Sequence, residues 1–267
     1  MQIIKVPSSE GNLGKNSGCE NAPDRIIQKI EEFYANESGK EVKLDEFKID
    51  EAKISKGNID ETNKNIYEKA KKVFNDKDFP VFLGGDHSIT YSLFKAFSEK
   101  NKNSGLLIFD AHPDTEKGMK SISHEDFLRK LVEDKILKKE NVILVGLRNW
   151  SIEEFRFLNE NKIKVFNMKS IFEYGIKEFC DNIMEIAREF ESLYLSLDID
   201  VTDPGATPGT GYIEPGGLSS RELIYFIQRI GLLKNLKVAD IAEVNPEKDI
   251  NDMTSKLAAK IIVELSR

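Results

Sequence analysis

Potential metal ligands follow three separate apolar runs of this sequence. They are His87 in "VFLGGDHSIT" (81–90), Asp110, His112 and Asp114 in "LLIFDAHPDT" (106–115), and Asp198 and Asp200 in "YLSLDIDVTDPG" (194–205). Alternate residues of an extended segment point to the same side of the chain. The D-x-H-x-D and D-x-D spacings can therefore aim several side chains into one site.

Binding of two divalent cations is the chemistry that suits these residues. If the three segments meet, four carboxylates lie together with two imidazoles, and the carboxylates repel one another unless cations neutralise them. Carboxylate-rich sites with a minority of histidine suit Mn²⁺, whereas thiolate-rich sites suit Zn²⁺. Two ions that share one solvent molecule lower its pKa and supply a nucleophile near neutral pH. Each motif alone also occurs as a helix cap or a loop pair, so the prediction depends on all three together.

The apolar runs predict the strands that position these ligands. Continuous apolar stretches occur at 81–84, 106–109, 142–146, 163–166, 193–197 and 238–244. Runs without alternation are typical of strands that are buried on both faces of a parallel sheet. In open parallel sheets, ligands bind outside the carboxyl ends of the strands. The candidate ligands lie at that end of their runs.

Amphipathic helices are predicted between the strands. Apolar residues recur at helical spacing within 26–34, 66–74, 89–97 and 257–265. Capping boxes begin two further helices, at Ser151 with Glu154 and at Ser219 with Glu222. Alternating strands and helices predict a doubly wound α/β fold with helices on both sides of the sheet. We expect one domain over residues 1–267, in which the polar stretch 36–64 has no clear assignment.

Composition and charge exclude several classes of protein. The net charge is -7, which argues against nucleic-acid and membrane-surface partners because both bind to basic protein surfaces. No apolar run approaches the ~20 residues of a membrane helix, and "MQIIKVPSSEGN" has no signal-peptide pattern. The two cysteines, Cys19 and Cys180, have no paired spacing and are expected to be free thiols in a reducing compartment. We therefore expect a cytoplasmic protein.

These motifs resemble those of the ureohydrolase family, which contains arginases, agmatinases and related guanidino hydrolases. The matching pieces are "GGDHSIT", "DAHPD", "SLDIDVTDPGATPGTGYIEPGGLS" and "ADIAEVNP", with a weaker match in "GCENAPDRI". They occur in the family's order and span nearly the whole chain. The resemblance implies a three-layer α/β/α sandwich around a mostly parallel eight-stranded sheet, and a binuclear manganese centre.

The resemblance also implies a role for each ligand. One Mn²⁺ would be bound by His87 and Asp114, the other by His112 and Asp200, and both would be bridged by Asp110 and Asp198. Asp114 would also orient the shared solvent. Glu243 in "ADIAEVNP" matches the carboxylate that holds the substrate guanidinium, a cation whose planar fork suits two parallel charge-assisted hydrogen bonds.

His124 resembles the loop histidine that helps with proton transfer in agmatinases, although a loop histidine is often only a surface residue. The family usually has glycine after this histidine, whereas this chain has Glu125. The segment "SISHEDF" could therefore begin a helix earlier than in the family and redirect His124.

Four further positions bear on the choice of substrate. Glu116 stands where arginases have an asparagine, and its carboxylate would favour the free amine of agmatine, whereas Lys117 or Lys120 would favour a guanidino acid. Both lysines are equally consistent with a solvated loop. Tyr212 stands where the family generally has a small hydroxyl residue, so its phenol would narrow or reshape the pocket. The loop "DPGATPGTG" looks more like the agmatinase form than the arginase form.

The sequence therefore predicts hydrolysis of a guanidino group to urea and an amine, with agmatine as the leading substrate and putrescine as the amine. Asp114, His124 and Glu243 are the candidate catalytic residues, and Glu243, His124, Glu116 and Tyr212 are the candidate substrate-binding residues. Alternatives are hydrolysis of arginine, a guanidino acid or formiminoglutamate, a zinc deacetylase of related fold, and a metal-binding relative without turnover. Family members usually assemble as trimers or hexamers, so the resemblance implies a homo-trimer or homo-hexamer.

Overall fold

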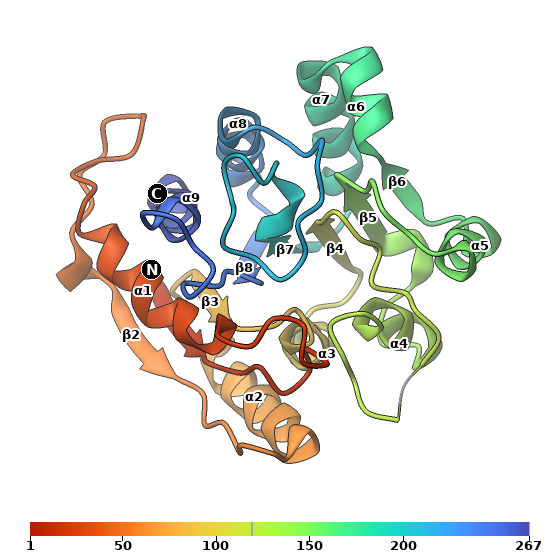
Figure 1. The fold of residues 1–267 in the computed structure, drawn as a ribbon, viewed down its shortest axis with the longest axis horizontal. Coiled ribbons are helices and arrows are strands. Elements are labelled where there is room, and N and C mark those ends of the chain that lie inside the picture. The colour runs from red at the N-terminus through yellow and green to blue at the C-terminus, as the bar shows by residue number, and fades with distance from the viewer. Residues whose placement is uncertain (119, 267) are drawn as a thin grey trace.

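The apolar runs form one sheet of eight strands, shown in Figure 1. The computed structural model describes residues 1–118 and 120–266. The strands are β1 (Gln2–Val6), β2 (Lys48–Glu51), β3 (Pro80–Gly84), β4 (Ser104–Phe109), β5 (Val142–Val145), β6 (Lys164–Phe166), β7 (Ser192–Asp198) and β8 (Leu236–Ala242). Their order across the sheet is β2-β1-β3-β8-β7-β4-β5-β6, and all neighbouring pairs are parallel. The α/β fold predicted from the sequence is thereby confirmed, with a sheet that is wholly parallel.

Helices cover both faces of this sheet and complete a three-layer sandwich (Figure 1). One layer contains α1 (Ala22–Ile30), α6 (Met168–Tyr174), α7 (Ile176–Arg188), α8 (Ser220–Gly231) and α9 (Met253–Leu265). The opposite layer contains α2 (Ile59–Val73), α3 (Ile89–Lys100), α4 (Phe127–Glu133) and α5 (Ile152–Asn161). Short 3₁₀ helices are η1 (Cys19–Asn21), η2 (Leu44–Glu46), η3 (Lys139–Asn141) and η4 (Ile199–Val201).

Each central strand contributes side chains to two hydrophobic cores, because its side chains alternate between the two faces of the sheet. In β4, Leu107 and Phe109 belong to the core beneath the first helix layer, and Leu106 and Ile108 to the core beneath the second. Both cores are continuous sets of buried side chains. Each fully buried Val, Leu, Ile, Phe or Met side chain contributes roughly 1.5–3 kcal/mol relative to exposure in water. This double burial explains why the strand sequences are apolar throughout and not alternating.

All six strands expected from the sequence are present, with ends that differ by one or two residues. Strands β1 and β2 had not been assigned. Strand β2 lies within the polar stretch 36–64 at the edge of the sheet, and all four of its residues are exposed. An exposed edge strand carries no apolar pattern, which is why the sequence does not reveal it. That residues 1–267 form one domain stays a prediction, although all eight strands belong to one sheet.

The helix predictions are confirmed with one correction. Both capping boxes are formed, at Ser151 with Glu154 and at Ser219 with Glu222. The helical spacing within 26–34 was wrong at its end, because α1 stops at Ile30 and Tyr34 lies 87% exposed beyond it. Cys19 and Cys180 are free and buried, as expected. Among the described residues, no helix combines the length and apolar character needed to cross a membrane.

Candidate metal centre and substrate pocket

The four central strands bring the candidate residues together. Strands β3, β8, β7 and β4 are consecutive neighbours, and their carboxyl ends meet at one edge of the sheet. Asp198 is the last residue of β7, while Asp110 and Glu243 directly follow β4 and β8. His87 lies in the turn between β3 and α3. Segments far apart in the sequence therefore converge, as expected for ligand sites in parallel sheets.

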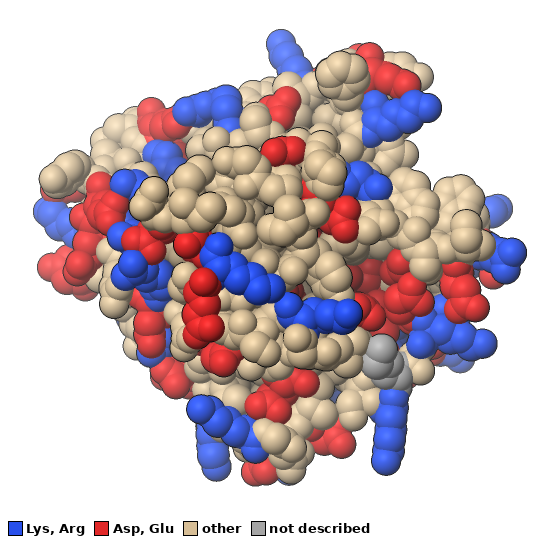
Figure 2. Space-filling model, viewed as in Figure 1, with Lys and Arg blue, Asp and Glu red and all other residues tan. Residues whose placement is uncertain are grey.

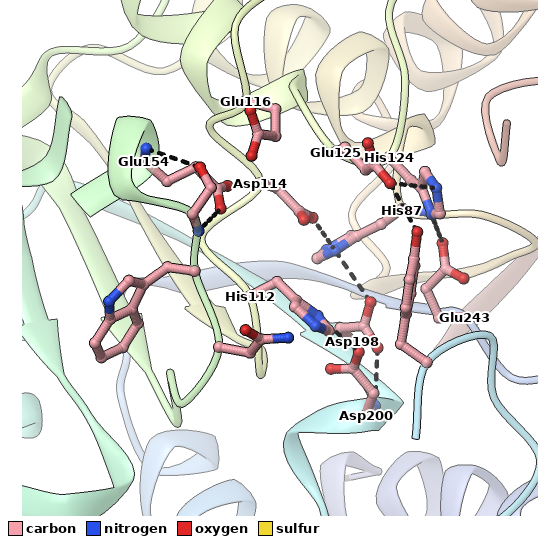
Figure 3. A pocket seen from close by; sticks show the side chains of 14 residues that line it. His87, His112, Asp114, Glu116, His124, Glu125, Glu154, Asp198, Asp200 and Glu243 are labelled. Atoms are coloured by element: carbon pink, nitrogen blue, oxygen red, sulfur yellow. Dashed lines mark hydrogen bonds and ion pairs between the residues drawn. The ribbon is translucent and has the colours of Figure 1, made fainter. Parts of the chain in front are cut away.

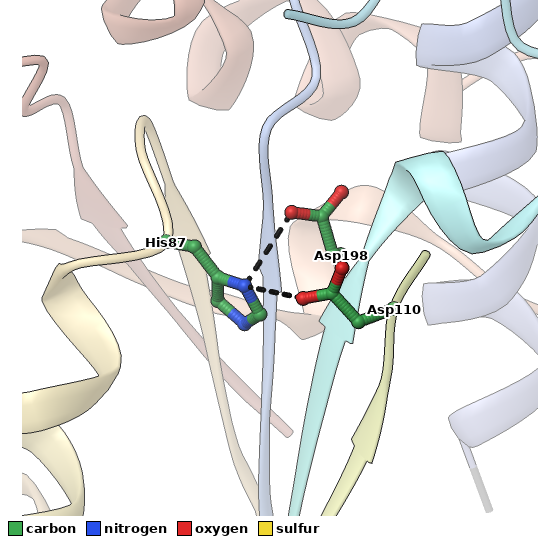
Figure 4. Close-up of side chains that lie close together, drawn as sticks. All are labelled: His87, Asp110 and Asp198. Atoms are coloured by element: carbon green, nitrogen blue, oxygen red, sulfur yellow. Dashed lines mark ion pairs between the residues drawn. The ribbon is translucent and has the colours of Figure 1, made fainter. Parts of the chain in front are cut away.

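The imidazole of His87 faces three carboxylates. Its Nδ1 atom lies 3.0 Å from Asp110 Oδ2, 3.1 Å from Asp114 Oδ2 and 3.4 Å from Asp198 Oδ2. Figure 4 shows the imidazole of His87 facing both Asp110 and Asp198. His87, Asp110 and Asp198 form one group of N and O donors close enough to share a cation, and Asp114 lies beside it.

A second group surrounds His112. Its Nδ1 atom lies 3.1 Å from Asp200 Oδ2 and 3.6 Å from Asp110 Oδ1. Asp110 thus points one carboxylate oxygen at each group, which is the geometry of a bridging ligand. The two groups differ from the ligand sets that the resemblance implied in two respects. Asp114 lies 3.1 Å from His87 but belongs to neither group. Asp198 belongs only to the His87 group, and its Oδ1 accepts a hydrogen bond from the Asp200 amide.

The protein atoms of this centre fit divalent cations. His87 Nδ1 and Asp110 Oδ2 lie 3.0 Å apart, yet neither buried atom makes a hydrogen bond of regular geometry among the described residues. Such atoms are costly unless something else binds them. Burial and the charge of Asp110 raise the pKa of Asp114 to about 8. Burial and the charges of Asp200 and Asp110 raise the pKa of Asp198 well above its usual range. A cation relieves this repulsion, and a donor set of two imidazoles and four carboxylates suits a metal such as Mn²⁺.

Close backbone contacts hold the loops that carry these ligands. A Cβ on Gly85 would lie 1.7 Å from the main-chain oxygen of Ser8, so only glycine permits the β3 loop to pass the end of β1. Asp114 and Glu243 adopt left-handed conformations, with φ of 50° and 63°. Non-glycine residues seldom adopt this region, and at functional sites surrounding contacts hold them there.

A buried hydrogen-bond chain lies behind His87. Its Nε2 atom is 2.9 Å from Ser196 Oγ, which donates to Asp240 Oδ1 at 2.7 Å, while Tyr194 and Thr90 donate to Asp240 Oδ2. The chain fixes the imidazole so that Nδ1 points to the carboxylates, a common arrangement behind histidine ligands. Sequence reasoning missed Asp240, although an aspartate inside the apolar run "VADIAEV" is a signal that could have revealed it.

Glu243 is held by donors from three segments. Its Oε1 atom accepts from the His87 amide at 2.7 Å and lies 3.2 Å from His124 Nδ1. Its Oε2 atom accepts from Asn16 Nδ2 at 2.6 Å. Burial raises the pKa of Glu243, but hydrogen bonding to His124 and the charge of His124 outweigh it and lower the pKa overall. Glu243 is therefore a buried carboxylate that stays ionised.

His124 points into the site. Helix α4 begins only at Phe127, so the earlier helix start considered from the sequence was wrong, and His124 lies in the turn before it. Burial lowers the pKa of His124, but the hydrogen bond and charge of Glu243 outweigh it and raise the pKa to about 9. The imidazole is therefore mainly protonated at neutral pH and can donate a proton.

A pocket of about 220 Å³ opens over the two ligand groups. Its lining comprises His87, His112, Asp114, Glu116, His124, Glu125, Asn149, Trp150, Ser151, Glu154, Asp198, Asp200, Tyr212 and Glu243, drawn in Figure 3. All the sequence-predicted site residues except the buried Asp110 thus line one cavity. Lys117 and Lys120 are exposed and do not line it. Four of the lining residues are not predicted from the sequence as pocket residues, namely Asn149, Trp150, Ser151 and Glu154.

The pocket is acidic, and its described lining includes no lysine or arginine. Glu116, Glu125 and Glu154 join the ligand carboxylates around it. In the matching surface view of Figure 2, a group of acidic side chains lies right of centre, whereas elsewhere on this face both signs of charge are interspersed. Such a pocket attracts a cationic molecule and repels an anionic one.

Comparisons with known proteins agree with this geometry. The model of the Arginase family matches residues 1–266. An arginase from Staphylococcus aureus is 33% identical over 219 residues, covering 76% of this chain and 72% of the relative. An agmatinase from Bacillus subtilis is 31% identical over 212 residues, covering 78% and 67%. The crystal structure of a formimidoylglutamase from Bacillus subtilis superposes with a TM-score of 0.92 at 26% identity, covering 99% of this chain and 84% of that one.

Proposed function

This chain belongs to the arginase family, and on that premise we propose that it hydrolyses a guanidino group to urea and an amine, using two Mn²⁺ ions per chain. The observation that carries the proposal is the pair of ligand groups that share Asp110, beside a buried carboxylate and a protonated histidine. The proposed metal ligands are His87, Asp110, His112, Asp114, Asp198 and Asp200.

Glu243 binds the substrate guanidinium in this proposal. Each carboxylate oxygen has two lone pairs, and Oε1 already has two close nitrogen neighbours, the His87 amide and His124 Nδ1. A guanidinium that engages both oxygens of Glu243 therefore replaces His124 on Oε1. Binding of the substrate thus frees the His124 imidazolium to donate elsewhere.

The reaction exchanges a C–N bond for a C–O bond. When bound, the two ions supply a solvent nucleophile of lowered pKa and stabilise negative charge that develops on the substrate. Asp114 accepts the solvent proton on its carboxylate as oxygen bonds to the guanidinium carbon. His124 then donates a proton to the leaving nitrogen as the C–N bond breaks, and the hydroxyl proton of the protonated urea returns to His124. The amine takes the proton held by Asp114, so that the products are urea and an ammonium ion.

Agmatine is the substrate that we propose. The relatives are named for arginine, agmatine and formimidoylglutamate chemistry, so the family alone leaves the choice open. Glu116 and the other carboxylates around the pocket favour the ammonium tail of agmatine. The tails of arginine and formimidoylglutamate carry carboxylates, which this lining would repel. Neither Lys117 nor Lys120 lines the pocket to reverse that preference.

The test is product release by the Mn²⁺-loaded protein from agmatine, arginine, 4-guanidinobutyrate and formimidoylglutamate, compared side by side. We expect urea from agmatine at the highest kcat/KM. Formamide from formimidoylglutamate as the main product would replace the proposal with the second candidate, which is favoured by the high structural similarity to the formimidoylglutamase. Two bound metals without any product would point to a relative without turnover.

We also propose that the chain assembles as a homo-trimer or homo-hexamer in the cytoplasm, as the family resemblance implied. Light scattering coupled to gel filtration measures the mass of the assembly directly. A monomeric mass for the active protein would refute this part of the proposal.

A further inference from the structure

Two positions at which this chain departs from the family's pattern contact each other. By the family resemblance, Glu125 stands where a glycine usually follows the loop histidine, and Tyr212 stands where a small hydroxyl residue is usual. The Tyr212 hydroxyl donates to Glu125 Oε1 at 2.7 Å across 87 residues of sequence. The contact needs both residues. A glycine at position 125 has no side-chain acceptor, and a small hydroxyl residue at position 212 is too short to extend as far as the tyrosine does.

Resting on the proposed function, we propose that Glu125 and Tyr212 act as one specificity-determining pair, which selects guanidines that carry a second positive charge. Glu125 binds the cationic group remote from the reacting carbon. Tyr212 fixes the orientation of that carboxylate and forms the wall against which the alkyl chain of the substrate packs.

The position of Tyr212 supports the wall. Its ring centroid lies 5.2 Å from that of His112 and 5.8 Å from that of His124, so the phenol covers the space between the two imidazoles. Burial and the Glu125 carboxylate raise the pKa of Tyr212, and the phenol therefore remains a hydrogen-bond donor at neutral pH. The ring is apolar and rigid, which suits contact with methylene groups.

The position of Glu125 supports the cationic subsite. Its side chain lines the pocket and is 30% exposed, so the carboxylate is partly desolvated but accessible. Figure 3 shows Glu125 beside His124, with the metal-ligand candidates in the same cavity. A carboxylate accepts about four hydrogen bonds, and Tyr212 uses only one of them. The remaining capacity suits an ammonium group, which is a compact donor of three hydrogen bonds.

One competing role is a purely local effect on His124, whose Nε2 lies 4.0 Å from Glu125 Oε1. In that case Glu125 would stabilise the imidazolium and affect every substrate alike. Substrates that differ only at the tail separate the two roles. Agmatine and butylguanidine have the same reacting group and the same chain length, but only agmatine carries the ammonium.

The experiment measures kcat and KM of the Mn²⁺-loaded protein for agmatine, butylguanidine and 4-guanidinobutyrate. We expect the wild type to prefer agmatine. Glu125→Gln should lower kcat/KM for agmatine by about tenfold or more, mainly through KM, because a tenfold change corresponds to one lost contact of about 1.4 kcal/mol. The same variant should leave butylguanidine within about threefold, so the loss is confined to the charged tail.

Tyr212→Phe is the second variant, since it keeps the ring and removes only the hydroxyl. It should reduce the preference for agmatine less than Glu125→Gln does, and the double variant should resemble Glu125→Gln. Glu153→Gln is the matched control, because Glu153 is an exposed glutamate on α5 that does not line the pocket. Thermal unfolding of each variant identifies any general loss of structure.

Four results would overturn the proposal that Glu125 and Tyr212 act as a specificity-determining pair. If Glu125→Gln lowered kcat/KM equally for agmatine and butylguanidine and shifted the pH profile, the role of Glu125 would be to stabilise the His124 imidazolium instead. If the preference for agmatine over butylguanidine were unchanged in both Glu125→Gln and Tyr212→Phe, neither residue would recognise the charged tail of the substrate. A wild type whose kcat/KM for butylguanidine equals that for agmatine would refute the pair while the proposed hydrolase function stands. A wild type that releases urea from no guanidine would refute both.

Discussion

Asn16 binds Glu243 twice across 227 residues of sequence. Its side-chain amide donates to Glu243 Oε2 at 2.6 Å and to the main-chain oxygen of the same residue at 3.1 Å. Asn245 in turn donates to Asn16 Oδ1 at 2.7 Å. The loop before α1 thus holds the candidate guanidinium-binding carboxylate in both its side-chain direction and its left-handed backbone conformation.

Asn16→Ala should therefore impair substrate binding. We expect kcat/KM for the guanidino substrate to fall by about 10–100-fold, and stability to fall by about 1–3 kcal/mol because a buried acceptor loses its donor. Steady-state kinetics and denaturant unfolding measure the two effects. Asn21→Ala is the control, since Asn21 makes an exposed hydrogen bond to Glu247. Full activity in Asn16→Ala, with only a loss of stability, would show that this contact does not position Glu243 for binding.

His112→Asn should remove one metal ion and not both. His112 belongs to the group that contains Asp200, whereas His87 belongs to the other. Metal analysis after gel filtration should find two Mn²⁺ per wild-type chain and one per variant chain, and activity should fall by about 100-fold or more. His124→Asn should keep both ions because His124 belongs to neither group. Two tightly bound ions in His112→Asn would contradict the assignment.

The pH dependence of catalysis should report His124. Its pKa is raised from 6.5 to about 9, so the proton-donating form predominates below that pH and is lost above it. With His124 as the proton donor, kcat/KM, which reports the substrate-free protein, should decline on the alkaline side with an apparent pKa near 9. His124→Gln should lower kcat by about 10²–10⁴-fold and abolish that alkaline decline. An unchanged decline in the variant would assign the titration to another group.

Gly85→Ala should prevent the β3 loop from reaching its position. The added Cβ would meet main-chain atoms of Ser8, which cannot turn away as a flexible side chain does. We expect a loss of about 3 kcal/mol or more in the free energy of unfolding, together with weaker metal binding at His87. Gly118→Ala should change stability by no more than about 0.5 kcal/mol, because the one described atom that its Cβ would meet is Lys130 Cε, at 3.8 Å. Equal stability of the two variants would contradict the close approach.

The six candidate metal ligands could be predicted from the sequence because each follows an apolar run. In a parallel sheet the carboxyl ends of neighbouring strands meet at one edge, so residues after such runs become neighbours even when they are far apart in sequence. The same logic placed Glu243 after β8. Strand β2 could not be predicted, because all four of its residues are exposed and an exposed edge strand has no apolar pattern in its sequence.

Tertiary structure alone decided which loop residues complete the site. Asn16 lies in a polar loop with no periodicity, and nothing in its surroundings indicates a partner 227 residues away. Glu125 and Tyr212 were each noticed as single departures, yet only the folded chain shows that they bind each other. Local pattern predicts elements because burial repeats with the period of a helix or strand. Contacts between loops have no such period, so the packing of the whole chain is needed to determine them.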